Sequence, residues 1–513
     1  MRRREGLFYL VPVLFFLALG ALWPLYRVLE RGLGPAALAV IADPYLMGRF
    51  LWSLGWAAGT SLLVIGLGLP LAYLLRQAFP GRRLFIALLT VPFVMPVLVV
   101  AVGFLALVGP RGLLGVNLVH TALVLFWAAV FYNLGLAARV LEGLLAGGEA
   151  LEAAARTLGA GPWRTFLRVT LPHLRPGLLS AAGLAFIYTF ASLGLPLILG
   201  GPGFATLEVV IYERLAYRLD FAAASALVLW QAAVLMGVTF FYLRAAGQGL
   251  VSARSPRPAA SPRARLLLGG VAWGFLFLFL APLWALVLES LKTPEGFGLA
   301  YYARLFANGG SYFVPGAGLA IKNTLRFALA ALALAAPVGL FYALGVHRGV
   351  RGLDLLGMVP LFLSPVSLGV GYLLAYPFWR ASAFLLVLAY ATMGFPLFAR
   401  ALIPALRALR PSWLEAAATL GAGPLRRLLR LELPLVRPAL FAGAALALAS
   451  AIGEFGATLL LVRPEWATLS IAIYERLGRP GVYNYGEALA LSVLLMLVSG
   501  ALFFLFGARA EGG

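Results

Sequence analysis

The sequence of 513 residues has no cysteine, three histidines and two lysines, and each scarcity excludes a class of chemistry. Without thiols there are no disulfides, iron–sulfur centres or thiolate zinc sites. His120, His173 and His347 are too few and too scattered along the chain to form a metal cage. Lys292 and Lys322 lie outside any G-x-x-x-x-G-K-S/T sequence, so the chain has no P-loop for a nucleotide. No cofactor is expected, and any ATP-driven step must use another subunit.

Charged residues are also scarce, at 12% of the chain, whereas 62% of the residues are hydrophobic and the mean hydropathy is +0.96. A soluble globular protein could neither bury nor expose so much apolar surface. The sequence therefore predicts a polytopic membrane protein. An intramembrane enzyme is a rival class, but H-E-x-x-H, paired intramembrane aspartates and G-x-S-x-G are all absent.

Apolar stretches set the expected fold. A helix needs about 20 apolar residues to cross a bilayer core of about 30 Å. Stretches of this length occur twelve times, six on either side of a segment rich in Pro, Ser, Ala and Arg. We therefore expect an all-α polytopic membrane protein of about 12 transmembrane helices. The expected spans are residues 7–29, 53–76, 84–108, 117–138, 177–200, 221–244, 265–288, 323–346, 352–376, 382–404, 439–461 and 486–507.

The net charge of +21 would suggest nucleic-acid binding in a soluble protein. Here the arginines follow the positive-inside rule instead, so no nucleic acid is needed as a partner. Arg2, Arg3 and Arg4 place the N-terminus in the cytoplasm, and an even number of spans returns the C-terminus to the same side. The same topology places these arginines in the cytoplasm: Arg82, Arg83, Arg254, Arg257, Arg263, Arg265 and Arg351.

A basic, proline-containing segment occurs twice. Residues 157–178 and 419–440 both begin T-L-G-A-G-P, 262 residues apart. The same displacement relates I-Y-E-R-L at 211–215 to I-Y-E-R-L at 473–477. The simplest interpretation is a duplicated cytoplasmic docking element within a duplicated unit.

The duplication predicts the domain organisation. We expect a first transmembrane domain at 1–244, a flexible cytoplasmic linker at 245–264 and a second transmembrane domain at 265–513. Six spans in each half give both halves the same orientation. They are therefore expected to be parallel repeats, which enclose a path at their interface.

Each repeated segment is predicted to form two short helices joined by a bend. Gly159 suits the left-handed residue that ends a helix, and Pro162 suits the first turn of the next. Pro172 and Pro176 are expected to stop this second helix and turn the chain into the fifth span.

One face of the second helix is apolar in both copies. A basic amphipathic loop commonly lies on lipid headgroups, which is the alternative to docking. Two copies with the same Gly, Pro and Arg positions favour docking. The residues of this face are Trp163, Phe166 and Leu167 in the first copy and Leu425, Leu428 and Leu429 in the second.

The order E-A-A, then G, then L-P and a further P resembles the signature of the transmembrane subunits of type I binding-protein-dependent ABC importers. In that family the segment forms a coupling helix that seats in a groove of the ATPase subunit. The resemblance implies the type I importer fold as two parallel six-helix repeats, and a non-catalytic subunit of the bacterial cytoplasmic (inner) membrane. It also implies two copies of a cytoplasmic ABC ATPase and an external or periplasmic substrate-binding protein as partners.

The resemblance assigns ATPase coupling to residues 149–176 and 412–438. In the first copy Ala153 stands where an acidic residue is expected and Glu152 lies one place early, so the acidic contact is weaker or shifted there. The coupling residues that it implies are Glu152, Ala154, Ala155, Gly159, Pro162, Pro172, Pro176, Glu415, Ala416, Ala417, Gly421, Pro424, Pro434 and Pro438.

Fused twelve-span chains resemble most the thiamine and ferric-iron branches of this family. F-Y-N-L-G-L-A-A-R at 131–139, L-G-G-P at 199–202 and G-E-F-G-A at 453–457 look more like the thiamine branch. Thiamine or ferric iron is therefore the expected substrate, moved by alternating access. An ion-coupled secondary transporter or channel is the alternative, and it predicts ion-binding carboxylates near the membrane midplane.

Polar residues within the expected spans are candidates for the translocation path, because burying them in a membrane is costly. Glu454 lies 16 residues after Pro438, which is about 24 Å along a helix and near the outer mouth. There it would suit a cationic substrate, although pairing with a backbone group or an arginine explains it equally well. The candidate path residues are Asn133, Tyr188, Ser192, Glu454 and Thr458, and Gln231 is a further polar residue within a span.

Overall fold

The computed structural model describes residues 2–246, 261–307, 310–311, 314–350, 352–357, 359–380 and 382–511. Most of these residues lie in helices, and the strands among them form two short antiparallel hairpins. One pairs β1 (Lys292–Thr293) with β2 (Gly296–Phe297), and the other pairs β3 (Gly310–Ser311) with β4 (Val314–Pro315). Residues 247–260 of the predicted linker lie outside the described part of the chain.

Eight helices in the described ranges are long and apolar enough to cross a membrane, and two bent helix pairs raise the number to ten. The all-α polytopic class is therefore confirmed. The predicted spans 177–200 and 352–376 are not in this set. The helix within 177–200 ends at Phe190, and Pro196 then opens a separate π-helical turn, where its missing N–H needs no partner. Prolines likewise divide 352–376 into short helices.

The chain forms two compact units that do not follow the order of the sequence. Unit 1 contains residues 1–39, 211–229 and 290–513, and unit 2 contains 40–210 and 230–289. The first helices of each predicted half therefore group with the later helices of the other half. The boundaries 1–244 and 265–513 stay a prediction about the repeat. Four helices contain a boundary between units: α3 (Pro35–Ala42), α11 (Leu207–Ala216), α12 (Phe221–Ala246) and α14 (Ala281–Leu291).

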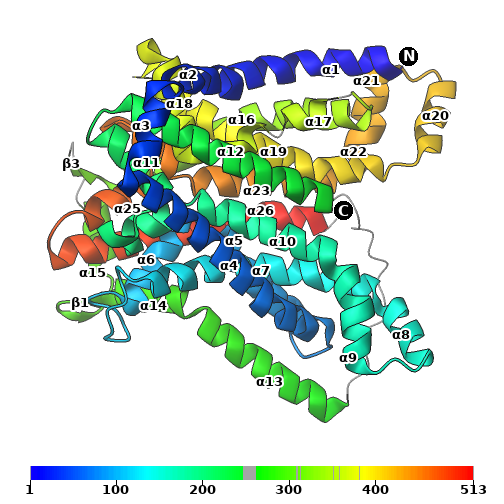
Figure 1. Cartoon of the computed structure of the whole chain (residues 1–513), viewed down its shortest axis with the longest axis horizontal. Helices are drawn as coiled ribbons and strands as arrows, with labels where there is room; N and C mark the ends of the chain where they lie inside the picture. The colour runs from blue at the N-terminus through cyan, green and yellow to red at the C-terminus, as the bar shows by residue number, and fades with distance from the viewer. Residues whose placement is uncertain are drawn as a thin grey trace. The chain divides into compact units, whose positions relative to one another are not determined.

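In unit 2 three long helices pack pairwise against one another: α4 (Pro44–Arg76), α7 (Ala122–Gly147) and α10 (Leu171–Phe190) (Figure 1). Their buried contact is aliphatic and includes Ala72, Leu141 and Leu174. The other elements are α5 (Arg82–Val94), α6 (Val97–Val108), α8 (Glu149–Thr157), α9 (Pro162–Thr165), the π-helical turns η2 (Phe166–Thr170) and η3 (Pro196–Gly200), the 3-10 turn η4 (Pro202–Phe204) and α13 (Pro262–Phe279).

Helix α13 is held on α5 by an aromatic contact. The indole Nε1 of Trp273 donates to the Pro80 carbonyl at 3.1 Å, and the ring meets Phe85 edge to face at 6.0 Å. A Cβ at Gly81 would lie 2.8 Å from the Trp273 ring, so this close approach requires glycine. Residues from both sides of the predicted linker thus pack against one another.

In unit 1 the helices α16 (Ala317–His347), α19 (Ala383–Arg407) and α23 (Arg437–Ile452) form the core. Phe395 of α19 lies edge to face with Tyr342 and with Phe16. The other elements are α1 (Arg2–Leu17), the π-helical turn η1 (Ala18–Leu22), α2 (Trp23–Gly32), α15 (Ala300–Ala307), α17 (Leu353–Leu356), the 3-10 turn η5 (Val359–Phe362), α18 (Pro365–Ala375), the 3-10 turn η6 (Pro377–Trp379), α20 (Pro411–Thr419), α21 (Pro424–Arg427), the π-helical turn η7 (Leu428–Glu432), α22 (Leu433–Leu435), α24 (Gly456–Leu461), the 3-10 turn η8 (Pro464–Trp466), α25 (Leu469–Leu477) and α26 (Val482–Glu511).

The N-terminal helix is tied into unit 1 through its π-helical turn. A π turn changes the backbone hydrogen-bond pattern and makes carbonyl groups available to other donors. The Tyr372 hydroxyl donates to the Gly20 carbonyl at 2.9 Å, and the Tyr376 hydroxyl donates to the Leu19 carbonyl at 2.6 Å. The first helix therefore bonds to α18, which lies more than 300 residues later in the chain.

Candidate functional site

The first docking segment, residues 149–176, bends at Gly159, as the sequence predicts. Helix α8 ends in a Schellman motif, in which Gly159 has φ +79°. The Ala160 N–H donates to the Ala155 carbonyl and the Gly159 N–H donates to the Arg156 carbonyl, each at 3.0 Å. Pro162 then opens α9 at its first turn. The segment projects beyond the ends of α7 and α10 (Figure 1).

The second docking segment, residues 412–438, repeats this geometry. Gly421 also has φ +79°, and the N–H groups of Ala422 and Gly421 donate to Ala417 and Ala418, again at 3.0 Å. Pro424 opens α21. The bent pair of short helices is therefore found in both copies.

The prolines after the bend act differently from the prediction. The second helix does not stop at Pro172, because the π-helical turn η2 leads directly into α10, whose first turn contains Pro172 and whose interior contains Pro176. In the second copy Pro434 lies in α22, and a 74° bend separates that helix from α23, whose first turn contains Pro438. The stop expected from proline is thus wrong for the first copy, where the helical backbone runs without a break from η2 through Pro172 and Pro176.

The tip of each segment exposes apolar side chains. Leu158 is 87% exposed and Leu420 is 86% exposed, at equivalent positions beside the two bends. Water-exposed apolar side chains grouped in this way are typical of protein contacts. Of the predicted apolar face, Trp163, Leu167, Leu425 and Leu429 are exposed, Phe166 is half-buried and Leu428 is buried.

The two acidic residues that the resemblance implies face in different directions. Glu415 is exposed, as are Ala154 and Ala416, while Ala155 and Ala417 are half-buried. Glu152 is only 6% exposed. Its carboxylate lies 3.2 Å from Arg76 Nη2 and accepts a hydrogen bond from the Thr170 hydroxyl at 2.9 Å. Glu152 therefore faces α4, and the docking role of every residue in the predicted set, Glu152 included, stays a prediction.

A corresponding ion pair in the second copy involves two residues outside the predicted set. Glu432, 4% exposed, lies 3.6 Å from Arg348 Nη2 at the end of α16. In the first copy Arg76 also pairs with Glu149 at 3.0 Å. The sequence contains a signal for these pairs. An arginine stands at the end of an apolar helix in each half, and an acidic residue stands within each docking segment.

In unit 2 the candidate path residues Asn133 and Tyr188 lie on the packed helices α7 and α10. The Asn133 amide donates to the Ala129 carbonyl at 2.9 Å and to the Thr189 hydroxyl at 3.4 Å. Tyr188 is half-buried and meets the Phe93 ring edge to face at 5.3 Å. Ser192 lies buried at the break after α10.

In unit 1 Glu454 and Thr458 lie at the break between α23 and α24. Glu454 is 5% exposed, and its carboxylate accepts from the N–H groups of Ala457 at 2.9 Å and Thr458 at 3.0 Å. It also accepts from the Thr458 hydroxyl, which contacts the Tyr390 hydroxyl at 2.6 Å. The carboxylate therefore caps the N-terminus of α24, which is the structural alternative that the sequence left open.

The comparison with protein families decides the class of this molecule. The family described as "Binding-protein-dependent transport system inner membrane component" matches residues 64–254 and again 335–510. The chain belongs to this family. It is the permease component of an ABC importer, an inner-membrane subunit that works with an ATPase and a substrate-binding protein.

Relatives of the permease cover nearly its whole length. The thiamine transport system permease protein ThiP of Brucella abortus (strain 2308) is 29% identical, over 94% of this chain and 91% of its own. ThiP of Escherichia coli (strain K12) is 27% identical, over 91% and 89%. The ferric transport system permease protein FbpB of Actinobacillus pleuropneumoniae is 27% identical, over 84% of this chain and 66% of its own.

Two repeat-related tyrosines of the permease share one environment in unit 1. Tyr212 and Tyr474 occupy the same place in the two I-Y-E-R-L sequences. Burial raises the pKa of both phenols, that of Tyr474 to about 12, and the neighbouring phenol Tyr217 adds to the effect. Both hydroxyls therefore stay protonated at neutral pH and can donate hydrogen bonds.

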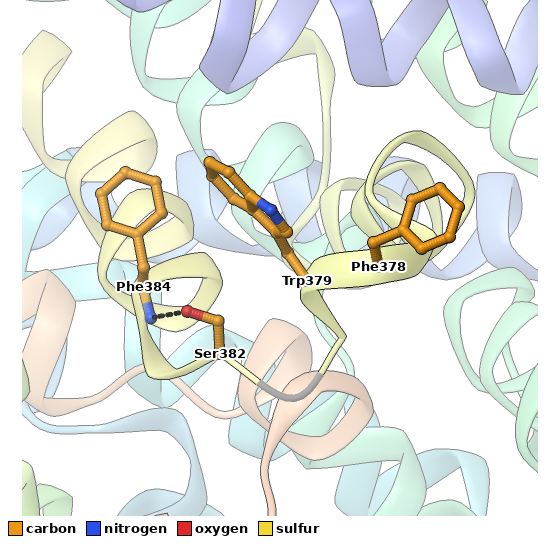
Figure 2. Close-up of a pocket in the computed structure, with 4 residues that line it drawn as sticks. All are labelled: Phe378, Trp379, Ser382 and Phe384. Carbon is orange, nitrogen blue, oxygen red and sulfur yellow. Dashed lines mark hydrogen bonds between the residues drawn. The ribbon is translucent and has the colours of Figure 1, made fainter.

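An aromatic pocket lies between α18 and α19 of the permease. Figure 2 shows Trp379 between Phe378 and Phe384, with the Phe384 N–H donating to the Ser382 hydroxyl at 3.2 Å. Phe378 is 97% exposed. Clustered exposed aromatic rings are typical of the belt at a membrane–water interface, so this pocket is not assigned to substrate.

Proposed function

We propose that the permease imports thiamine, which an external binding protein delivers to it. The observation that carries this proposal is the naming of its full-length relatives as thiamine permeases. Thiamine is an organic cation, and the sequence runs around 131–139 and 453–457 agree with that branch. Ferric iron is the second candidate, because FbpB is also a relative.

We further propose that two copies of the ATPase bind, one at each docking segment. Two bends with the same φ present Leu158 and Leu420 in the same way, which supports two equivalent sites. Burying each exposed leucine in a groove would contribute about 1.5–3 kcal/mol. The arginine distribution supports a cytoplasmic location for both segments and both chain termini.

In this proposal the permease itself performs no chemistry. ATP binding draws the two ATPase copies together, and each docking segment is displaced with its copy. Helices joined to the segments then shift, so that the path opens first to one side of the membrane and then to the other. Substrate moves because its access changes, without an ion gradient.

Reconstitution tests the proposal. The permease, its ATPase and its binding protein are placed in liposomes, and uptake of labelled thiamine is followed with and without ATP. We expect ATP-dependent uptake that unlabelled thiamine inhibits and ferric iron does not. Inhibition by iron alone would transfer the assignment to the second candidate.

Two controls separate the remaining alternatives. The purified permease without ATPase should hydrolyse no ATP, and hydrolysis that tracked this chain would contradict the non-catalytic assignment. Uptake driven by an imposed proton or sodium gradient in the absence of ATP would instead support the ion-coupled transporter.

A further inference from the structure

Each docking segment is fixed at its base by a buried ion pair with a long helix. Arg76 is the last residue of α4, and Arg348 caps the C-terminus of α16. Glu152 lies in the first turn of α8, whereas Glu432 is the last residue of the π-helical turn η7, which continues into α22. Each cation therefore lies at a helix C-terminus, where the helix dipole favours it, and only Glu152 has the matching place at a helix N-terminus.

These pairs are not copies of one another. By the 262-residue displacement Glu152 corresponds to Leu414, and Glu432 corresponds to Thr170. The acid thus comes from before the bend in the first copy and from after it in the second. Thr170 nevertheless bonds to Glu152, so the same position takes part in both copies. Both copies thus pair a buried acid of the docking segment with an arginine, although the acid comes from different positions. This recurrence suggests that the ion pair itself has a function.

The burial of these pairs contrasts with the exposure of the segment tips. The side chains of Arg76 and Glu152 are 11% and 8% exposed, and those of Arg348 and Glu432 are 12% and 6% exposed. Salt screens such buried charges weakly, so the attraction persists under cellular conditions. A force applied at Leu158 or Leu420 would reach the spans through the base of the segment.

We propose that Arg76 with Glu152, and Arg348 with Glu432, are positioning pairs that transmit the movement of each docking segment to α4 and to α16. This inference rests on the proposed docking of the ATPase at the two segments. The pairs touch neither nucleotide nor substrate. Their loss should separate ATP hydrolysis from transport rather than abolish either activity.

The test measures thiamine transported per ATP hydrolysed, in liposomes with the ATPase and the binding protein. In Glu432→Gln we expect this ratio to fall about tenfold, which is within the range of coupling energies between contacting residues. The double variant Arg348→Glu with Glu432→Arg restores the opposite charges and should recover most of the ratio. Glu432→Asp, which keeps the charge, serves if the other variants fold poorly.

Glu142→Gln is the matched control. It breaks the pair between Arg82 and Glu142, whose atoms lie 2.7 Å apart in unit 2, but neither residue belongs to a docking segment. Its transport ratio should equal that of the unaltered permease. A fall as large as that in Glu432→Gln would overturn the proposal, since an ion pair outside the docking segments would then have the same effect.

Docking is measured separately by cross-linking. The chain has no cysteine, so Leu420→Cys provides a single thiol for cross-linking to the ATPase. We expect Glu432→Gln to leave the cross-link intact. An intact cross-link with an unchanged transport ratio would overturn the positioning role alone. Absence of the cross-link even without Glu432→Gln would overturn docking, and the positioning role with it.

Discussion

The two docking segments share a backbone and differ in how they are anchored. Both end their first helix with a glycine at φ +79°, and both continue through a five-residue π-helical turn at equivalent positions. Arg76 has two acidic partners in the first segment, Glu149 and Glu152. In the second, Glu432 pairs with Arg348 across 3.6 Å, and the chain bends by 74° before α23.

This difference separates what the bend needs from what the anchor needs. Glycine adopts the left-handed backbone conformation at lower cost than other residues. The bend therefore requires Gly159 and Gly421 at matching positions. An ion pair needs only opposite charges within reach, so the acid can move from one helix to another. Backbone geometry is therefore the repeated feature, and the anchor is the feature that varies.

The largest expected effect is on stability. Glu432→Ala leaves Arg348 buried without this partner and should lower the free energy of unfolding by about 3–5 kcal/mol. Glu152→Ala leaves Arg76 with Glu149, so we expect a smaller loss of about 1–3 kcal/mol. Unfolding titrations of the two purified variants in mixed micelles measure both values. Equal losses would show that the second acidic partner of Arg76 does not strengthen its anchor.

Substitution of the glycine at either bend should reduce transport to the same extent. In both Gly159→Val and Gly421→Val, a β-branched residue at positive φ costs about 1–3 kcal/mol. No atom lies within 4 Å of a Cβ at either glycine, so the cost is confined to the backbone. We expect similar losses of transport with membrane insertion intact.

Gly161→Val and Gly423→Val are the controls for the bends. Both glycines have φ −66° and open space around a Cβ, so valine meets neither strain nor clash. Their transport should stay close to that of the unaltered permease. Wild-type transport in Gly421→Val would show that the left-handed bend is not needed for docking.

The candidate path residues can be compared in the same way, because Ser192 lies at the break between α10 and η3 and Glu454 lies at the break between α23 and α24. Glu454→Gln weakens the cap of α24, which is worth about 0.5–2 kcal/mol. If the carboxylate also attracts the substrate, this variant should slow thiamine uptake without loss of ATPase cross-linking. Ser192→Ala, at the equivalent position, should have a smaller effect. Unchanged uptake in Glu454→Gln would leave the residue with its capping role alone.

Sequence reasoning located the docking segments because glycine and proline act locally. Gly159 and Pro162 bend and restart a helix through their own φ restrictions, whatever surrounds them. The same local rule fails at Pro172, where the preceding π-helical turn continues directly into α10. Local rules could identify a helix end but not the turn that bridges it.

Contacts between distant residues could not be predicted in this way. Glu152 and Arg76 lie 76 residues apart, and only the packing of α8 beside α4 shows that the carboxylate faces inward. The same holds for the hydrogen bonds of Tyr372 and Tyr376 to the N-terminal helix, which place it with the later helices. Charge and hydropathy identify a membrane helix but do not choose its neighbours.

The smallest expected effect concerns the exposed acid. Glu415 is exposed in the second segment, whereas Ala153 occupies its place in the first. Ala153→Glu should strengthen ATPase binding by about 0.2–1 kcal/mol, and Glu415→Gln should weaken it by a similar amount, because exposed ion pairs contribute little. Titration of the permease with ATPase measures both changes, and added salt should reduce them. If Ala153→Glu left the affinity unchanged while Glu415→Gln lowered it, the two ATPase copies would contact different surfaces. The two tips would then share their backbone conformation but not their side-chain contacts with the ATPase.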